Sequence, residues 1–418
     1  MSRVLMTGNA AAAWGARLAE VDYVPAFPIT PQTEIIESLS AWIDSGEMEG
    51  RLVTLDSEHS MVTAAGAAAA TGIRVFSATS SQGLLYAMEM LYTVSGWRAP
   101  FVLVNVSRGL SAPITLEPDH NDILAARDSG FLQIHCATCQ ELLDSVLLAY
   151  RLGEDPSVRL PVLVNMDGFY LSFTREPVEI PEQDRVRRFL PAFDPGALQF
   201  KASAPESQAV AVLGGGPYSY FRYETHIAAL NGLDAYDRIS AEFAQLFGRK
   251  HPAVEAYRCE DADYLFVMMG SFATKAKAAV DSLREAGWKI GLVRPRLLRP
   301  FPDKLLQQLL AGRRAVAVID QNISMGGGGV LYTEIAAALF GLPDAPQLMA
   351  SFIGGLGGRD IAPEEFFQIA RVTRDAAERG ERLPARLLYT DSELRETRKL
   401  QSIAGVERRE LKGGVTND

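Results

Sequence analysis

The sequence predicts an α/β fold, in which a parallel sheet covered by helices is followed by a second α/β domain and a charged tail. Strand-like and helix-like segments alternate over residues 1–175, and this alternation is typical of parallel sheets. It stops in a proline- and charge-rich stretch and resumes near residue 261. A length of 418 residues also exceeds what one hydrophobic core usually supports. We therefore expect domains at 1–175 and 261–372, a linker and connecting helix at 176–260, and a tail at 373–418.

The composition is that of an ordinary soluble globular protein, with 48% apolar and 22% charged residues. A formal charge of -10 and the lack of a basic run argue against a nucleic-acid partner. The apolar patch at the N-terminus is far shorter than a signal or membrane segment, so we expect no membrane partner and a cytoplasmic location. Cys136, Cys139 and Cys259 are too few for a disulfide framework or a complete metal site, and we expect reduced, buried thiols.

The first domain is expected to open with a strand and a helix over residues 1–20. An amphipathic helix follows Pro31, because apolar residues recur there at helical spacing. The continuous apolar run from Phe101 to Val106 is typical of a strand buried on both faces. Further strands are expected at Tyr23 to Ala26, Leu52 to Leu55, Arg74 to Ser77, Leu132 to His135 and Pro161 to Met166, and further helices at about Ser60 to Thr71, Leu84 to Ser95 and Gln140 to Gly153.

The segment from Arg175 to about Ala204 is expected to connect the domains over the surface, because it is rich in proline and charge. The run Gly326 to Gly329 matches neither GxGxxG nor a Walker A motif, so a tight structural turn is favoured over a phosphate site. The tail is expected to wrap a neighbouring chain or to be partly disordered. The remaining elements are helices at Tyr223 to Phe247 and Thr274 to Ala286, and strands at Tyr264 to Ser271 (with its turn), Lys289 to Arg294 and Ala315 to Asp320.

Polar residues follow three of the expected strands in the first domain, namely Thr30, Glu58 and Arg108. Open parallel sheets bind ligands at the carboxyl ends of their strands, so these side chains could face one crevice. A guanidinium beside a hydroxyl suits a planar carboxylate, whereas a buried carboxylate is expected to act on a proton. Ser81 and Gln82, in the polar turn after another strand, could face the same crevice. The residues alone therefore predict an α/β enzyme that binds a small carboxylate.

Each of these residues also has a simpler interpretation. Glu58 could only favour the N-terminus of a tightly packed small-residue helix. Thr30 could be a helix N-cap before Pro31, and Arg108 a surface or salt-bridged residue. His120 could be a hydrogen-bonded loop residue without a catalytic role. The pattern leaves these alternatives open.

Several distinctive motifs follow one another along the chain. The motifs of the first half are FPITPQTE (27–34), TLDSEHSMVTAAGAAAATG (54–72), SATSSQGL (77–84), SRGLSAPITLEPDHND (107–122) and MDGF (166–169). The second half contains SMGGGGVL and the stretch around VMMGSFATK. Together these motifs resemble the alpha subunit of the 2-oxoacid:ferredoxin oxidoreductases, whose transketolase C-terminal-like domain the second half resembles. The resemblance covers nearly the whole chain, and the ordered set is more specific than any one motif.

The resemblance implies that the first domain is a pyrimidine-binding half of a thiamine diphosphate site. In that family a glutamate, here Glu58, hydrogen-bonds N1′ of the aminopyrimidine and promotes the imino tautomer that removes the C2 proton. It implies that Thr30 and Arg108 hold the carboxylate and keto group of a 2-oxo acid, and that Ser81 and Gln82 line the cofactor crevice. The implied reaction is oxidative decarboxylation to an acyl-coenzyme A, with electrons passing to iron-sulfur clusters and then to ferredoxin or an NAD-linked subunit.

The same resemblance implies partner chains. The sequence lacks the GDG and following Asn that hold magnesium and the diphosphate in such enzymes, and it lacks cysteines for a cluster. A beta subunit is expected to supply both, with gamma- and delta-like subunits completing an oxygen-sensitive complex. The segment Thr115 to Pro118 differs from the run usual in pyruvate enzymes, which leaves pyruvate, 2-oxoglutarate, a branched-chain acid or phenylglyoxylate as substrate. The alternatives are a non-catalytic scaffold subunit and a non-oxidative, transketolase-like or decarboxylase component.

Overall fold

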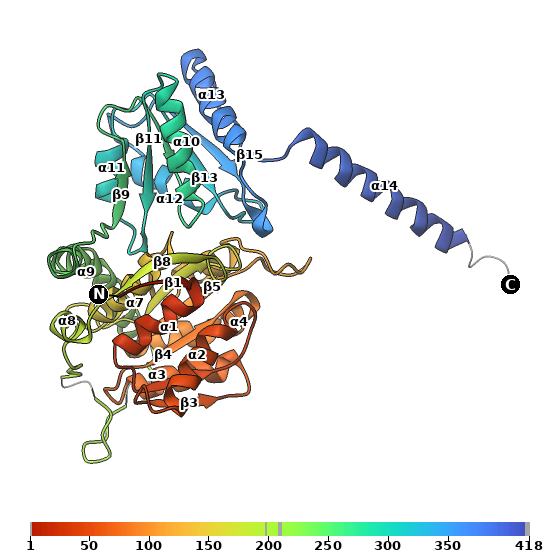
Figure 1. The fold of residues 1–418 in the computed structure, drawn as a ribbon. Coiled ribbons are helices and arrows are strands. Elements are labelled where there is room, and N and C mark those ends of the chain that lie inside the picture. Colours follow the sequence, from red (N-terminus) through yellow and green to blue (C-terminus); the bar gives the residue numbers. More distant parts are fainter. Residues whose placement is uncertain (1, 197–198, 208–210, 414–418) are drawn as a thin grey trace.

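The computed structural model describes residues 2–196, 199–207 and 211–413. It consists of two α/β units, one above the other in Figure 1, with a helix that extends from the second. The first unit is built on a five-stranded sheet and the second on a six-stranded sheet. This arrangement confirms the predicted α/β fold class with parallel sheets.

The first sheet has the strand order β12-β6-β7-β5-β4, and its last four strands are parallel. The edge strand β12 comes from far along the chain and pairs antiparallel with β6, which the sequence did not predict. Two further parallel strands, β2 and β3, extend the layer through a bridge between Tyr23 and Val75. The strands are β2 (Tyr23–Ala26), β3 (Arg51–Thr54), β4 (Phe76–Thr79), β5 (Val102–Ser107), β6 (Leu132–His135), β7 (Val162–Asp167) and β12 (Leu297–Arg299).

Helices cover both faces of this sheet, as predicted. Along β5, Val104 belongs to the core cluster shared with α1 and α7, whereas Leu103 belongs to the cluster shared with α3 and α5. A strand whose alternate residues enter two cores must be apolar throughout, which explains its sequence. The helices of this unit are α1 (Gly8–Leu18), α2 (Thr33–Asp44), α3 (Glu58–Ala69), α4 (Ser81–Tyr86), α5 (Met88–Trp97), α6 (Asn121–Ala125), the 3-10 turn η1 (Ala126–Asp128) and α7 (Cys139–Gly153).

The small residues of α3 allow a close helix contact. A Cβ atom added at Gly66 would lie 2.3 Å from a methyl group of Val94 in α5. The missing side chain therefore lets α5 approach α3 closely, and a larger residue would separate them. This packing holds the N-terminus of α3, where Glu58 lies, against the ends of the neighbouring strands.

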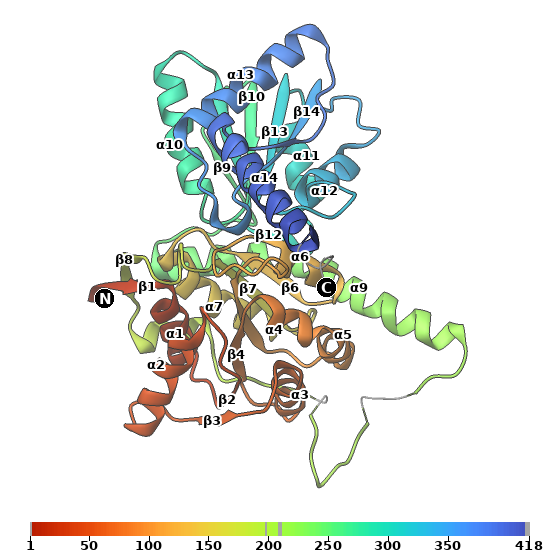
Figure 2. The same cartoon turned by 90° about the vertical axis from the view of Figure 1, so that its right-hand side faces the viewer.

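The segment predicted as a plain surface connection contains regular structure, so that prediction is wrong for residues 175–189. Strand β8 (Arg175–Ile180) pairs antiparallel with β1 (Ser2–Thr7) over its whole length, and α8 (Gln183–Phe189) buries Phe189. The expected connecting helix is longer than predicted: α9 spans Gly215–Phe247. Its C-terminal part packs on the first core, while its N-terminal part projects from the body (Figure 2).

The second sheet has the order β15-β14-β13-β10-β11-β9, and only β9 is antiparallel to its neighbour. Its strands and helices follow the predicted alternation. The strands are β9 (Val254–Tyr257), β10 (Tyr264–Val267), β11 (Ile290–Pro295), β13 (Ala315–Asp320), β14 (Leu348–Ile353) and β15 (Arg386–Leu387); the helices are α10 (Ala273–Glu285), α11 (Asp303–Leu310), α12 (Val330–Leu339), the 3-10 turn η2 (Leu356–Gly358) and α13 (Pro363–Arg379).

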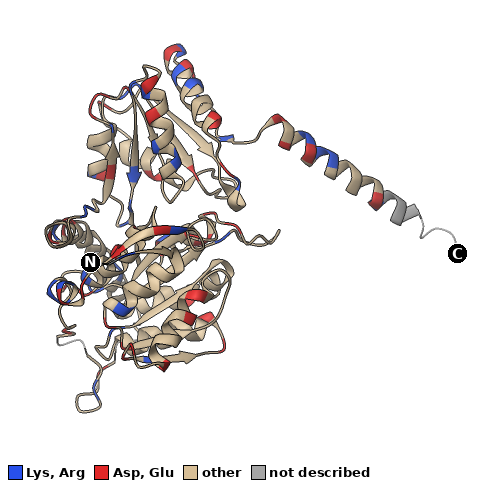
Figure 3. Ribbon diagram, in the orientation of Figure 1, with Lys and Arg blue, Asp and Glu red and all other residues tan. Residues whose placement is uncertain are grey.

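The tail begins later than predicted. Thr373 and Ala376 are buried within α13, so a tail starting at 373 is wrong. Beyond it, α14 (Asp391–Gly413) extends away from both units, and Figure 3 shows charges of both signs along it. The last part of the predicted tail, 414–418, lies outside the described residues. In the part of the chain that the structure describes, no helix is both long and apolar enough to cross a membrane.

Candidate active site

The Glu58 carboxylate is buried and has no hydrogen-bond donor among the described residues. Glu58 is the first residue of α3, where Ser57 caps the helix by accepting a hydrogen bond from the Ser60 amide at 3.2 Å. Only 5% of Glu58 is exposed, and no described residue donates a hydrogen bond to it. A negative charge in the first helical turn is favoured by the helix dipole, but this interaction does not supply hydrogen-bond donors to the carboxylate oxygens. A carboxylate in this state is available to a ligand.

Gly83 brings the turn after β4 against Glu58. A Cβ atom at this position would lie 2.4 Å from Glu58 Oε1 and 2.7 Å from Thr79 Oγ1. Any other residue would therefore displace the carboxylate. The glycine in the SSQG sequence thus lets the Ser81 and Gln82 turn lie beside Glu58.

Arg108 joins two of the other predicted residues. Its guanidinium donates from Nη1 to the Thr30 carbonyl oxygen at 2.8 Å and from Nη2 to Gln82 Oε1 at 2.7 Å. Gln82 Oε1 also accepts a hydrogen bond from Ser81 Oγ at 2.6 Å. Arg108 is 7% exposed and burial lowers its pKa, so the surface interpretation of this residue is wrong.

Thr30 contributes to this cluster through its backbone. The side chain is exposed and forms no hydrogen bond with the described residues, so its hydroxyl is available to a ligand. Helix α2 begins at Thr33 with Gln32 in the N-cap position, and therefore the N-cap interpretation of Thr30 is wrong. The structure thus brings all five predicted site residues together at the carboxyl ends of β2, β4 and β5, with Glu58 added at the start of α3.

Sequence reasoning missed the buried residue Asp122, which holds the turns of this site. Its Oδ2 accepts hydrogen bonds from the amides of Ser81 at 3.0 Å and Arg108 at 3.2 Å, and from Asn105 Nδ2 at 3.1 Å. Complete burial raises the pKa of Asp122, while these and other donors oppose the rise. The only signal in the sequence was the polar run DHND, which indicates a polar loop but no role.

His120 joins the two halves of the molecule and is not part of the cluster. Its Nε2 lies 2.7 Å from Asp167 Oδ1, and Asp167 Oδ2 accepts a hydrogen bond from the Ser271 amide at 2.8 Å. Burial lowers the pKa of His120, but the Asp167 carboxylate outweighs it and the net direction is upward. The interpretation as a hydrogen-bonded loop residue is confirmed.

The Gly326–Gly329 run is a structural turn. The N-terminus of α12, which follows it, already binds the side chain of Asp320. Asp320 accepts hydrogen bonds from the amides of Leu331 at 2.7 Å and Tyr332 at 3.2 Å. A Cβ atom at Gly329 would lie 2.0 Å from Asp320 Oδ2. Burial raises the pKa of Asp320 to about 7. A protein carboxylate thus fills the place where a phosphate would bind.

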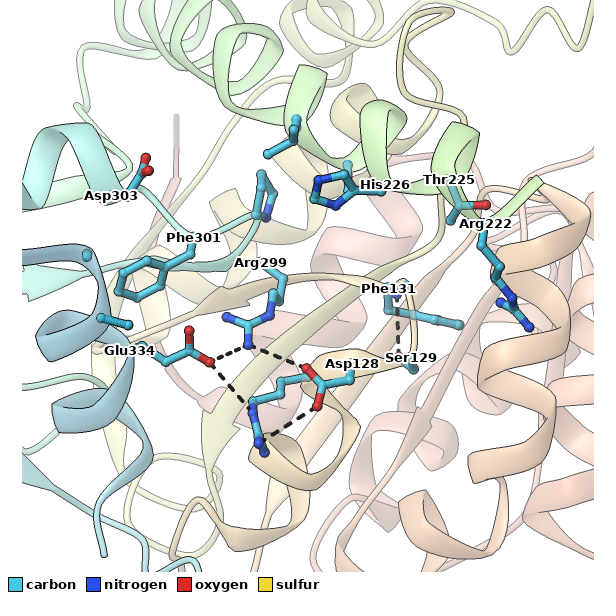
Figure 4. A pocket seen from close by; sticks show the side chains of 17 residues that line it. Asp128, Ser129, Phe131, Arg222, Thr225, His226, Arg299, Phe301, Asp303 and Glu334 are labelled. Atoms are coloured by element: carbon cyan, nitrogen blue, oxygen red, sulfur yellow. Dashed lines mark hydrogen bonds and ion pairs between the residues drawn. The ribbon is translucent and has the colours of Figure 1, made fainter. Parts of the chain in front are cut away.

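A cavity of about 610 Å³ lies elsewhere, between α9, α12 and the residues around β12 (Figure 4). None of the five predicted site residues lines it. The charges on one wall are paired with one another, because Arg299 lies 2.5 Å from Glu334 and 3.6 Å from Asp128. The size of this cavity alone does not make it the chemical site. All three cysteines are buried, as predicted.

Comparison with known proteins agrees with this geometry. Residues 14–240 match the family model described as pyruvate flavodoxin/ferredoxin oxidoreductase, thiamine diphosphate binding, and residues 262–366 match pyruvate:ferredoxin oxidoreductase core domain II. The chain belongs to the 2-oxoacid:ferredoxin oxidoreductase family. The family predicted from the motifs is thereby confirmed.

Two kinds of curated relative are similar over most of their length. The pyruvate synthase subunit PorA of Methanothermobacter thermautotrophicus is 41% identical over 372 residues, which are 89% of this chain and 95% of the relative. The ketoisovalerate oxidoreductase subunit VorA of Pyrococcus horikoshii is 38% identical over 378 residues, or 90% and 95% of the two chains. These are subunit names, and the chain is one subunit of a 2-oxoacid oxidoreductase.

The fold also matches a solved structure. The 2-oxoglutarate:ferredoxin oxidoreductase from Magnetococcus marinus, with 2-oxoglutarate, coenzyme A and succinyl-CoA bound, superposes with a TM-score of 0.66 at 20% identity. The match covers 89% of this chain and 65% of that one. The match supports the two-unit α/β architecture. At 20% identity it is evidence for the fold and not for a shared function.

Proposed function

We propose that the chain is the alpha subunit of a heteromeric enzyme that oxidatively decarboxylates a 2-oxo acid with thiamine diphosphate. The product is an acyl-coenzyme A, and the two electrons pass to iron-sulfur clusters and then to ferredoxin or an NAD-linked subunit. The observation that carries the proposal is Glu58, a buried carboxylate without a donor among the described residues, in a chain that matches a thiamine diphosphate-binding family model.

The residues present fit the aminopyrimidine half of that cofactor. Glu58 offers an acceptor, or a shared proton, to a ring nitrogen, and Gly83 lets the neighbouring turn lie against it without displacing the carboxylate. Ser81 and Gln82 line the same crevice from the neighbouring turn. When bound, thiamine diphosphate supplies the electron sink that decarboxylation of a 2-oxo acid needs. In this proposal Glu58 holds the proton at N1′ of the pyrimidine.

Arg108 and Thr30 are proposed to bind the substrate. The Arg108 guanidinium is buried, is held by two hydrogen bonds and pairs with no carboxylate among the described residues, so its charge is available to an anion. The Thr30 hydroxyl can donate to the keto oxygen. Together they orient a 2-oxo acid by its carboxylate and keto group, the two features that all members of the substrate class share.

The proposal includes a division of the chain. A pyrimidine-binding unit includes residues 1–175 together with β8 and α8, and a connecting region runs on to residue 260. A transketolase C-terminal-like unit continues from residue 261 through α13, and the tail follows Arg379. The pairing of β8 with β1, the burial of Phe189 in α8 and the length of α13 support these bounds.

Partner chains are part of the proposal. A beta subunit supplies the diphosphate and magnesium site together with an iron-sulfur cluster, and gamma- and delta-like subunits complete the complex. The subunit names of PorA and VorA support a multi-subunit enzyme. A cytoplasmic location is also proposed.

The substrate is the least constrained part of the proposal. The relatives named for pyruvate and for ketoisovalerate are 41% and 38% identical to the chain, a difference too small to choose between them. The segment Thr115 to Pro118, which differs from the usual pyruvate pattern, keeps 2-oxoglutarate and phenylglyoxylate in the set.

The test is a dye assay on the native complex purified without oxygen. Viologen reduction is measured with coenzyme A and each of pyruvate, ketoisovalerate, 2-oxoglutarate and phenylglyoxylate. Reduction with one acid supports the proposal and names the substrate. If no acid supports dye reduction and the complex contains thiamine diphosphate but no iron, a non-oxidative component is favoured. If there is no dye reduction and neither cofactor is bound, the scaffold alternative is favoured.

A further inference from the structure

The loop Asp119 to Asp122 lies where the two halves of the molecule meet. Its first three residues are bonded to the second half, whereas Asp122 faces the candidate active site. The loop is therefore anchored on one side and directed toward the site on the other. The bonds to the second half run from the Gly357 amide to Asp119 Oδ2 (3.2 Å), from the His120 amide to the Gln321 carbonyl (2.8 Å) and from the Ile323 amide to Asn121 Oδ1 (3.1 Å).

Asp122 fastens the turns after β4 and β5 to each other. Its Oδ2 accepts from the backbone amides of Ser81 and Arg108, one in each turn. Its Oδ1 accepts from Ser107 Oγ at 2.5 Å and from the Ile123 amide at 2.7 Å. An ionised carboxylate only accepts hydrogen bonds, so it alone among side chains of this size can satisfy such a set of donors. Asp122 is completely buried, so a donor that loses this carboxylate would be left unpaired at a cost in stability.

The backbone of the turn after β4 depends on the hydrogen bond between the Ser81 amide and Asp122. Ser81 has a φ of 50°, a left-handed conformation that is uncommon for a residue with a side chain. The hydrogen bond from its amide to Asp122 holds that conformation. The same turn carries Gln82, whose Oε1 receives the hydrogen bond from Arg108 Nη2. Of the two hydrogen bonds that orient the guanidinium, one is therefore made to a turn that the Asp122 carboxylate holds.

We propose that Asp122 is a positioning residue, which presets the Arg108 and Gln82 pair for the 2-oxo acid by clamping their two turns together. The inference rests on the proposed function, because it gives Arg108 the substrate carboxylate. It also assigns a task to the second half of the chain, which anchors the loop that carries Asp122. A task of this kind acts on substrate binding and orientation, and it leaves the cofactor contact of Glu58 in place.

The experiment compares Asp122→Asn with Asp155→Asn in the assembled complex. The side-chain amide introduced by Asp122→Asn must turn its NH2 group toward one set of donors, so the clamp fails without a change in side-chain size. We expect KM for the 2-oxo acid to rise about tenfold or more, with KM for coenzyme A and the bound thiamine diphosphate unchanged. Asp155→Asn, a change at a buried carboxylate outside this loop that accepts hydrogen bonds from Ser157, is expected to leave KM for the 2-oxo acid unchanged. Equal losses in kcat for both variants at unchanged KM would mean that Asp122 is only structural.

A double variant separates this inference from the proposed function. If Asp122 acts through Arg108, Asp122→Asn adds little to the loss already caused by Arg108→Lys. Additive losses overturn the positioning role. Full activity of Arg108→Lys alone overturns the substrate role of Arg108, and with it the proposed site.

A milder variant tests the inference if the Asp122→Asn complex does not assemble. Ser107→Ala removes one donor to Asp122 and retains the carboxylate. We expect KM for the 2-oxo acid to rise two- to threefold, in the same direction as for Asp122→Asn. An unchanged KM in Ser107→Ala, together with loss of assembly in Asp122→Asn, overturns the inference.

Discussion

Asp320 and Glu58 are both buried carboxylates, but only Asp320 has hydrogen-bond donors among the described residues. This difference distinguishes a structural carboxylate from one that is available for chemistry. Asp320 ends a parallel strand and accepts hydrogen bonds from the amides of Leu331 and Tyr332. Glu58 begins a helix at the edge of the other sheet and accepts none from the described residues. Both lie against a glycine, so close backbone approach is common to the two sites. Burial alone therefore does not mark a functional carboxylate, whereas unused hydrogen-bonding capacity does.

The largest expected effect is on turnover when each carboxylate is replaced by its amide. Glu58→Gln should lower kcat by about 10³-fold, because it removes the group that holds the proton at the cofactor ring. Asp320→Asn should leave kcat within about twofold, since its partners are backbone amides of its own chain. Dye reduction by the purified complexes measures both. Glu89→Gln, a change at an exposed glutamate that lies against His59, is the matched control.

A loss of kcat in Asp320→Asn but not in Glu58→Gln would contradict the distinction between the two carboxylates. Full turnover in Glu58→Gln would mean that its free carboxylate has no part in the chemistry. The variant should still assemble and melt at the temperature of the unaltered complex, because no donor among the described residues loses its partner.

The second expected effect concerns the two glycines. Gly83→Ala places a methyl group 2.4 Å from Glu58 Oε1, so the carboxylate must move, and we expect a ten- to hundredfold loss of activity with lower thiamine diphosphate content. Gly329→Ala places a methyl group 2.0 Å from Asp320 Oδ2 and should instead destabilise the fold by about 2 kcal/mol. Cofactor content and thermal unfolding distinguish the two outcomes. Equal losses of stability in both variants would contradict the assignment of Glu58 to a ligand.

The strand ends of the site were predictable because a parallel sheet has one carboxyl edge. Thr30, Arg108 and the Ser81 turn each follow a strand whose apolar run is clear in the sequence, and so they had to approach one another. The free state of Glu58 was not predictable. Whether a buried carboxylate finds a donor depends on backbone amides whose direction no residue pattern specifies.

Long-range pairing explains the rest of what the sequence missed. The pairing of β8 with β1 joins residues more than 160 positions apart, and the charged, proline-containing sequence of β8 favours a loop. The strand β12 reaches the first sheet from the second half of the chain in the same way. Asp122 was visible as part of a polar run, but four consecutive polar residues there face different partners, and only the folded loop separates their roles.

The smallest expected effect is on the pH dependence of stability. Burial raises the pKa of Asp320 from the ordinary value of 3.8 to about 7 in the folded protein. The folded state therefore holds the proton more tightly than the unfolded state, and this contribution to stability is complete below pH 3.8 and is lost as the pH rises through 7. Asp320→Asn does not titrate, so its melting temperature should fall less than that of the unaltered complex between pH 5 and pH 8, by about 2 °C. Melting curves at matched scan rates measure this difference, and parallel pH profiles would mean that Asp320 is already ionised at pH 5 and is stabilised by its two amides alone.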